Sequence, residues 1–173
     1  MNILILNGSP RPNGVTSTMI EAFIDGAKDN GHEITVIPVG RKRIAGCMAC
    51  EYCHTKGEGH CVQQDDMQEI YAALGKAEMI IIASPIYYHN MTGQMQCAIN
   101  RTYAVGVPGN LKSCAIFLAS GSPEMYDGAL FEYRNTFLRY MKLEDKGIFT
   151  LCDEECKAPD AYEKVRAFGR NLK

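Results

Sequence analysis

The chain has no strong charge imbalance, no long apolar segment and no low-complexity tract. Its 18 Lys and Arg residues nearly balance 20 Asp and Glu, for a formal net charge of −2, so we expect neither nucleic acid nor an anionic membrane surface as a partner. No apolar run approaches the ~20 residues of a membrane-spanning helix. The N-terminus also lacks the basic and apolar regions of a signal peptide. We therefore expect no membrane association and a cytoplasmic location.

Internal repeats and linkers are absent too, which favours a single domain covering residues 1–173. With 46% hydrophobic and 22% charged residues, the chain has the composition of an ordinary globular protein with a sizeable core. Its eight cysteines are unusually many. Since disulfides are rare in the cytoplasm, metal binding or redox chemistry is the preferred explanation for them.

Short apolar segments alternate with amphipathic ones along the chain. The segments predict strands at about 3–6, 32–39, 79–83, 113–119 and 147–151, and helices at about 16–30, 65–75, 93–103, 125–141 and 161–171. This alternation predicts an α/β fold with a five-stranded parallel sheet and helices on both faces. The first strand is apolar throughout, whereas Pro38 indicates an edge position for the second. We therefore expect the strand order 2-1-3-4-5.

A loop rich in Gly and Pro, NGSPRPNG at 7–14, follows the first strand. Thr16, Ser17 and Thr18 come next and are candidate caps for the first helix. Free backbone N–H groups at a helix N-terminus, hydroxyls and the Arg11 side chain would suit a phosphate monoester. An ordinary capped turn between strand and helix is the alternative. Neither G-x-G-x-x-G nor G-x-x-x-x-G-K-[ST] is present, which disfavours a dinucleotide fingerprint and a P-loop.

Two further loops are expected at the same edge of the sheet. Residues 84–90 follow the third strand and contain Pro85, Tyr87 and Tyr88. Their backbone amides could meet the polar edge of a planar ring, and a tyrosine could stack on it, although one tyrosine could instead pack under a helix. Ser120-Gly121-Ser122 follows the fourth strand and allows close backbone approach. In the expected order, the loops after strands one and three are neighbours.

Two of these motifs carry a family resemblance. NGSPRPNGVTST at 7–18, together with SPIYYHNMTGQMQCAINR at 84–101, resembles the NADPH-dependent FMN reductase family of flavodoxin-like proteins, over residues 1 to about 118. The resemblance implies a flavodoxin-like three-layer sandwich and bound FMN. It also implies a homodimer or homotetramer with the flavin near a subunit interface. The residues that match the family's phosphate, isoalloxazine and third flavin loops are Ser9, Arg11, Asn13, Ser17, Thr18, Pro85, Ile86, Tyr87, Tyr88, Asn90, Ser120 and Gly121.

A Cys-rich loop at 46–62 holds Cys47, Cys50, Cys53 and Cys61, in the pattern C-x2-C-x2-C-x7-C. The first three follow the spacing of bacterial ferredoxins. The motif resembles the iron–sulfur flavoproteins, a branch of the same family with a [4Fe-4S] cluster, although the last gap is longer here. The alternatives are a zinc site that uses three or four of the cysteines or His54 or His60, and reduced or partly disulfide-linked thiols without metal.

Three functions follow from these features. The first is an FMN-dependent oxidoreductase that uses NAD(P)H to reduce a flavin, a quinone or another small-molecule acceptor. The second is an iron–sulfur flavoprotein that passes electrons between FMN, a [4Fe-4S] cluster and a ferredoxin-like partner. The third is a redox or metal sensor whose cysteines respond to oxidants. Because the cofactor would carry the chemistry, we assign no catalytic side chain.

Overall fold

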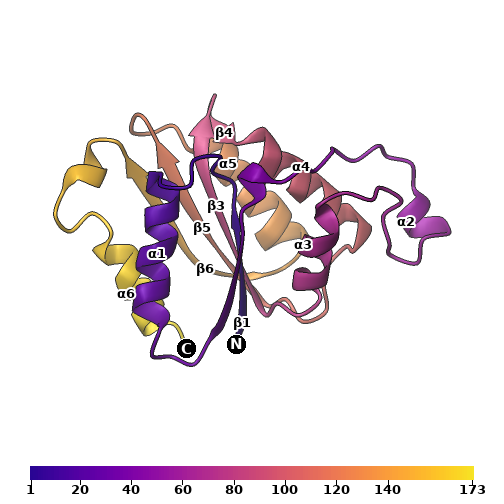
Figure 1. Ribbon diagram of the computed structural model, residues 1–173, viewed down its shortest axis with the longest axis horizontal. Helices are drawn as coiled ribbons and strands as arrows, with labels where there is room; N and C mark the ends of the chain where they lie inside the picture. The colour runs from indigo at the N-terminus through magenta and orange to yellow at the C-terminus, as the bar shows by residue number, and fades with distance from the viewer.

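A parallel sheet forms the centre of the structure, a computed structural model that describes residues 1–173 (Figure 1). Its strands lie in the order β2-β1-β3-β5-β6, and every pair along this path is parallel. Counted as the five predicted strands, this is the order 2-1-3-4-5, so the predicted fold class and strand order are confirmed. The strands are β1 (Asn2–Asn7), β2 (Glu33–Ile37), β3 (Met79–Tyr87), β5 (Ser113–Ser120) and β6 (Glu144–Cys152).

Helices cover both faces of the sheet, as Figure 1 shows, with α1 and α6 on one side and α3, α4 and α5 on the other. Alternate residues of each strand point to opposite faces. In β1, Ile3 and Ile5 therefore pack in the core under α1 and α6, while Leu4 and Leu6 pack in the core under the other helices. The helices are α1 (Val15–Ala27), α2 (Tyr52–Thr55), α3 (Met67–Leu74), α4 (Gly93–Arg101), α5 (Asp127–Tyr133) and α6 (Glu163–Asn171).

Shorter helical segments complete the chain. Three 3₁₀ turns are present, and α5 continues into a π-helical segment, so the helix expected at 125–141 changes geometry midway. The segments are η1 (Val39–Arg41), η2 (Thr102–Ala104), η3 (Arg134–Tyr140, the π-helical one) and η4 (Glu155–Lys157). None of the helices combines the length and the apolar character that crossing a bilayer requires.

The segment expected to be a loop at 84–91 is a hairpin instead. β3 runs on to Tyr87, turns at Tyr88 and His89, and returns as the short antiparallel strand β4 (Asn90–Met91). Both turn residues have positive φ, 48° and 65°. A type I′ hairpin turn, whose twist matches that of the strands, requires positive φ at both central residues. Pro85 is tolerated because β1 pairs with β3 only as far as Ala83, which leaves no partner on that side for a missing N–H.

Candidate functional site

A cleft of about 360 Å³ opens at the carboxyl ends of β1, β3 and β5. All three loops that the sequence singled out contribute to its wall. The predicted residues that line it are Ser9, Arg11, Pro85, Ile86, Tyr87, Ser120 and Gly121. The N-terminus of α1 also opens onto the cleft through Gly14, Val15 and Thr16. The first N–H groups of a helix have no partner within the helix, so this wall presents backbone donors and a positive dipole end to an anion.

The first loop is held in shape by its own side chains. Asn7 Oδ1 accepts from the backbone N–H of Ser9 at 2.9 Å, and Asn7 Nδ2 donates to Ser17 Oγ at 3.2 Å. Ser9 Oγ in turn accepts from the Arg11 N–H at 3.2 Å. Because the loop is ordered before a ligand arrives, less conformational entropy remains to be lost on binding.

The hydroxyl residues at 16–18 do not cap α1, so that part of the sequence prediction is wrong. The N-cap is Gly14, and no side chain bonds there. Thr16 and Ser17 are buried inside the first turn, and Thr18 Oγ1 donates back to the Gly14 carbonyl at 3.4 Å. The N-cap lies two residues before the first of the three hydroxyls. Ser17 and Thr18 therefore bond to Asn7 and to Gly14, and Thr16 lines the cleft.

Several other predicted flavin residues lie outside the cleft wall. Ser17 and Thr18 support the first loop from behind, and Asn13 is exposed on it. Tyr88 is fully exposed at the tip of the hairpin. Asn90 Oδ1 accepts from Gln96 Nε2 at 3.1 Å and so braces β4 against α4.

Two contributions to the cleft were missed by sequence reasoning. Asp153, in the segment after β6, adds a carboxylate to the wall. Its position just after the fifth predicted strand was the available signal, because loops after parallel strands share one edge of the sheet. Gly40 supports the first loop from beneath, since a Cβ there would lie 2.4 Å from the carbonyl carbon and oxygen of Ser9. Nothing in the local sequence signals that contact.

Thr92 joins the first and second loops. Its Oγ1 donates to the Gly8 carbonyl at 2.9 Å and accepts from the Met95 N–H at 3.3 Å, as the N-cap of α4. Its own N–H donates to Ser84 Oγ at 3.1 Å. One buried residue therefore fixes the two loops relative to each other.

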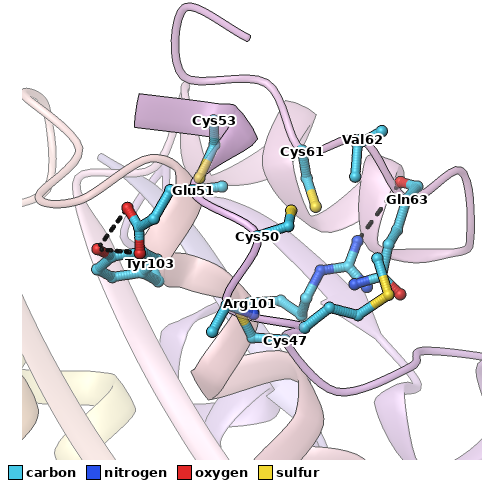
Figure 2. A pocket seen from close by; sticks show the side chains of 12 residues that line it. Cys47, Cys50, Glu51, Cys53, Cys61, Val62, Gln63, Arg101 and Tyr103 are labelled. Carbon is cyan, nitrogen blue, oxygen red and sulfur yellow. Dashed lines mark hydrogen bonds between the residues drawn. The ribbon is translucent and has the colours of Figure 1, made fainter. Parts of the chain in front are cut away.

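A second, small cavity of about 20 Å³ lies in the Cys-rich segment, and Cys47, Cys50, Cys53 and Cys61 all line it (Figure 2). Figure 2 shows the Cys50 and Cys61 side chains directed toward the same space. No three His, Cys, Asp or Glu side chains converge closely enough to hold one metal ion. The cavity shares no lining residue with the cleft.

The backbone around this cavity suits a sulfur-ligated group. The Ala49 N–H donates to Cys47 Sγ at 3.4 Å. Ala49 and Glu51 have positive φ, 51° and 56°. Alternation of right- and left-handed residues gathers backbone N–H groups into a concavity of the kind that binds anions and iron–sulfur clusters.

The two histidines offered for zinc are engaged elsewhere. His54 Nε2 bonds the Tyr103 carbonyl at 2.9 Å, and His60 Nδ1 bonds the Gly57 carbonyl at 3.0 Å. Neither lines the cavity. The donors around the cavity are therefore the four thiols and the Glu51 carboxylate, which accepts from the Tyr103 hydroxyl at 3.1 Å. Four thiols fit an iron–sulfur cluster and also a zinc ion held by cysteines alone.

Hydrogen bonds from the backbone to two aspartate side chains, and one between backbone groups, close the base of the Cys-rich loop, a feature we call the stem (residues 43–46 and 63–66). Asp66 Oδ2 accepts from the Arg43 N–H at 2.8 Å, and the Asp66 N–H donates to the Arg43 carbonyl at 3.2 Å. Asp65 Oδ2 accepts from the Ala45 N–H at 3.0 Å. The stem is thus paired on both sides before the first cysteine.

Comparison with known proteins identifies the family. Residues 1–143 match the sequence profile described as NADPH-dependent FMN reductase. The chain belongs to this family. The resemblance inferred from residues 7–18 and 84–101 is therefore confirmed.

Curated relatives of this FMN reductase family member are named iron-sulfur flavoproteins. One from Archaeoglobus fulgidus is 35% identical over 137 residues, which are 76% of this chain and 60% of the relative. One from Methanocaldococcus jannaschii is 37% identical over 105 residues, 61% of this chain and 52% of the relative. The matches thus span little more than half the length of these relatives.

Solved structures share the fold. The NAD(P)H:quinone oxidoreductase from Methanothermobacter marburgensis superposes with a TM-score of 0.75 at 19% identity, covering 99% of this chain and 96% of that one. An FMN-dependent NADH-azoreductase from Bacillus anthracis, in complex with FMN, gives a TM-score of 0.71 at 17% identity, covering 99% of each chain. At these identities the likeness supports the flavodoxin-like fold.

Proposed function

We propose that this chain binds FMN in the cleft and acts as an FMN-dependent oxidoreductase. Its electrons would come from NAD(P)H or a ferredoxin-like donor and pass to a flavin, a quinone or another small-molecule acceptor. The convergence of three separate loops on one cleft at the carboxyl edge of the sheet carries the proposal. Family membership supports it.

The cleft residues divide by chemistry. The N-terminus of α1, with Ser9 and Arg11, suits the phosphate, because backbone donors and a guanidinium both favour an anion. Pro85, Ile86 and Tyr87 offer an apolar and aromatic wall for the ring system. Ser120 and Gly121 close the remaining side. When bound, FMN supplies the capacity to accept a hydride and release electrons, and the protein orients it and limits its contact with water.

The remaining flavin-loop residues support this arrangement from outside the cleft wall. Ser17 holds Asn7, which positions the Ser9 N–H. Thr18 and Asn90 brace α1 and β4. Exposed Asn13 and Tyr88 are available to a ligand or a neighbouring subunit.

Titration of FMN into cofactor-free protein tests the phosphate placement. Arg11→Ala is expected to weaken FMN binding at least tenfold, since a hydrogen bond to a charged group contributes ~1.5–3 kcal/mol. Arg139→Ala removes an exposed arginine on η3, outside the cleft, and is the matched control. Equal FMN affinity in both variants would contradict the placement. Failure of the wild-type protein to take up FMN would overturn the proposed function itself.

A second function is favoured by the four cysteines that line one cavity. We propose that Cys47, Cys50, Cys53 and Cys61 hold an iron–sulfur cluster, expected to be [4Fe-4S], and that the protein transfers electrons. Such a cluster supplies one-electron exchange. The Ala49 N–H already bonded to sulfur and the absence of a histidine from the cavity support this donor set. The names of the curated relatives agree with it.

Iron and acid-labile sulfide assays on protein purified without oxygen test the cluster. We expect about four iron per chain for a cubane, and loss of most of it in Cys50→Ser. Cys97→Ser changes a half-buried thiol outside the cavity and is the matched control. Purified protein that contains flavin but no iron or sulfide would contradict the cluster proposal. The thiols would then be free for a sensor role.

We also propose a homodimer or homotetramer. Tyr88 on the hairpin, Phe131 on α5 and Tyr140 on η3 expose large aromatic side chains. Exposed aromatic surface is typical of protein interfaces. Light scattering of the purified protein tests this, and a monomer at micromolar concentration would contradict it.

A further inference from the structure

Arg101 is a fully buried arginine at the end of α4, with only 1% of its side chain exposed. Its guanidinium reaches across to the stem of the Cys-rich loop. Nη1 donates to the Ala45 carbonyl at 3.0 Å and to Asp65 Oδ2 at 2.8 Å. Nη2 donates to Asp65 Oδ1 at 3.2 Å. Arginine is rarely buried without several partners, and here the two terminal nitrogens account for all of them.

One donor of this guanidinium is left over. Arg101 Nε is the one buried side-chain nitrogen or oxygen with no hydrogen-bond partner. Arg101 also lines the small cavity together with the four cysteines. Figure 2 shows its guanidinium lying beside the space toward which Cys50 and Cys61 point. A buried donor without a partner is uncommon in native proteins and indicates a bond that a missing group would complete.

We propose that Arg101 donates its Nε–H to a sulfur of the iron–sulfur group that the four cysteines hold, and that its charge sets the reduction potential of that group. The inference rests on the cluster proposed above. Each electron added makes such a group more negative, so a nearby cation and an N–H···S hydrogen bond both favour its reduced form. Arg101 is thus a positioning residue that couples the stem to the electron-accepting group.

Asp65 acts in the opposite direction in the same network. Burial is the largest effect and raises the pKa of Asp65, but the hydrogen bonds from Arg101, Ala45 and Met67 and the charge of Arg101 together outweigh it, so the net pKa lies below its ordinary value. The carboxylate is therefore ionised, and its negative charge disfavours added electrons. Lysine could not do the same, because its single nitrogen cannot bond the stem as Nη1 and Nη2 do and also present a separate donor where Arg101 Nε lies.

Three variants test the inference: Arg101→Gln, Arg101→Lys and Asp65→Asn. Each is reconstituted anaerobically with iron and sulfide, assayed for both, and titrated with dithionite to obtain a midpoint potential. Arg101→Gln is expected to disfavour reduction at least tenfold, a shift of about 59 mV to lower potential for one electron. Arg101→Lys keeps the charge and is expected to shift less. Asp65→Asn is expected to shift the potential upward.

The opposed signs separate this role from a structural one. If the Arg101–Asp65 pair only stabilises the loop, both Arg101→Gln and Asp65→Asn should bind less iron and sulfide. Their midpoint potentials should then be unchanged or shift in the same direction, and that result overturns the inference. If Arg101→Gln takes up no iron, Arg101→Lys and Asp65→Asn decide by the same criterion. If the wild-type protein takes up no iron and sulfide, the cluster proposal fails first. FMN titration then shows that the cleft, and with it the fold, is intact.

Discussion

Replacing Thr92 by valine should both destabilise the fold and lower the affinity of the cleft for FMN. The side chain is 1% exposed, and valine has nearly its shape, so the change removes the hydroxyl and little else. Loss of the cap on Met95 costs ~1 kcal/mol. The Gly8 carbonyl loses its bond to a buried hydroxyl, at ~1–3 kcal/mol. Together we expect a loss of ~2–4 kcal/mol in the free energy of unfolding.

Urea unfolding of the cofactor-free protein measures this loss, and Thr92→Ser is the matched control. Serine keeps the hydroxyl and loses one methyl group, for ~1 kcal/mol. Since Gly8 lies in the first loop, the valine variant should also bind FMN more weakly than the serine variant. A valine variant as stable as wild type, or more stable than the serine variant, would refute the role assigned to the hydroxyl.

Three further predictions test other parts of the structure. Gly40→Ala should weaken FMN binding more than tenfold by displacing Ser9, whose carbonyl would lie 2.4 Å from the new Cβ; FMN titration measures this, and unchanged affinity would show that Gly40 does not set the loop. Burial raises the pKa of Glu132, against the hydrogen bond from Gln96. The folded chain therefore holds this proton more tightly than the unfolded chain, so stability should fall as pH rises above the ordinary carboxyl pKa and level off once Glu132 is ionised in the folded protein. The slope is at most about 1.4 kcal/mol for each pH unit in that window. Glu132→Gln should flatten that dependence in thermal melts at several pH values, and an equal slope would contradict the assignment. Finally, FMN at a hundredfold its Kd should add about 2.7 kcal/mol to the free energy of unfolding; a melting temperature independent of FMN would argue against binding to the folded chain.

The strand order was predictable because burial leaves a direct trace in sequence. Ile3 to Leu6 is an unbroken apolar run since both faces of β1 are covered by helices. β2 is largely exposed and is followed by Pro38, as an edge strand allows. Placing β1 in the centre and β2 at the edge gives the strand order. In that order the loops after β1 and β3 lie next to each other at the carboxyl edge of the sheet.

The hairpin at 84–91 was not predictable from local rules. Proline and polar residues indicate a loop. In the structure, however, β3 extends beyond the end of β1, and Pro85 lies in this extension and pairs only with β5. A strand tolerates proline where no neighbouring strand is present to accept the missing N–H. Here β1 stops pairing with β3 at Asn7 and Ala83, two residues before Pro85. Local sequence does not contain this information.

Arg101 escaped sequence reasoning for a related reason. It lies in the last turn of the helix predicted at about 93–103, where a basic residue is ordinarily exposed and favourable to the helix dipole. Its burial depends on Asp65, 36 positions earlier, which supplies the opposing charge. The four cysteines were visible as a motif, but the cation beside them appears only when α4 and the stem are brought together in space.

The closed stem makes the Cys-rich loop a module. Residues 43–46 and 63–66 are paired at the base of the loop, and no strand of the sheet lies between them. Doubling the length of such a loop costs only ~0.6 kcal/mol in closure entropy. A longer or shorter spacing between Cys53 and Cys61 is thus expected to cost little stability. Substitutions and insertions in the Cys-rich loop are therefore expected to leave the geometry of the cleft unchanged.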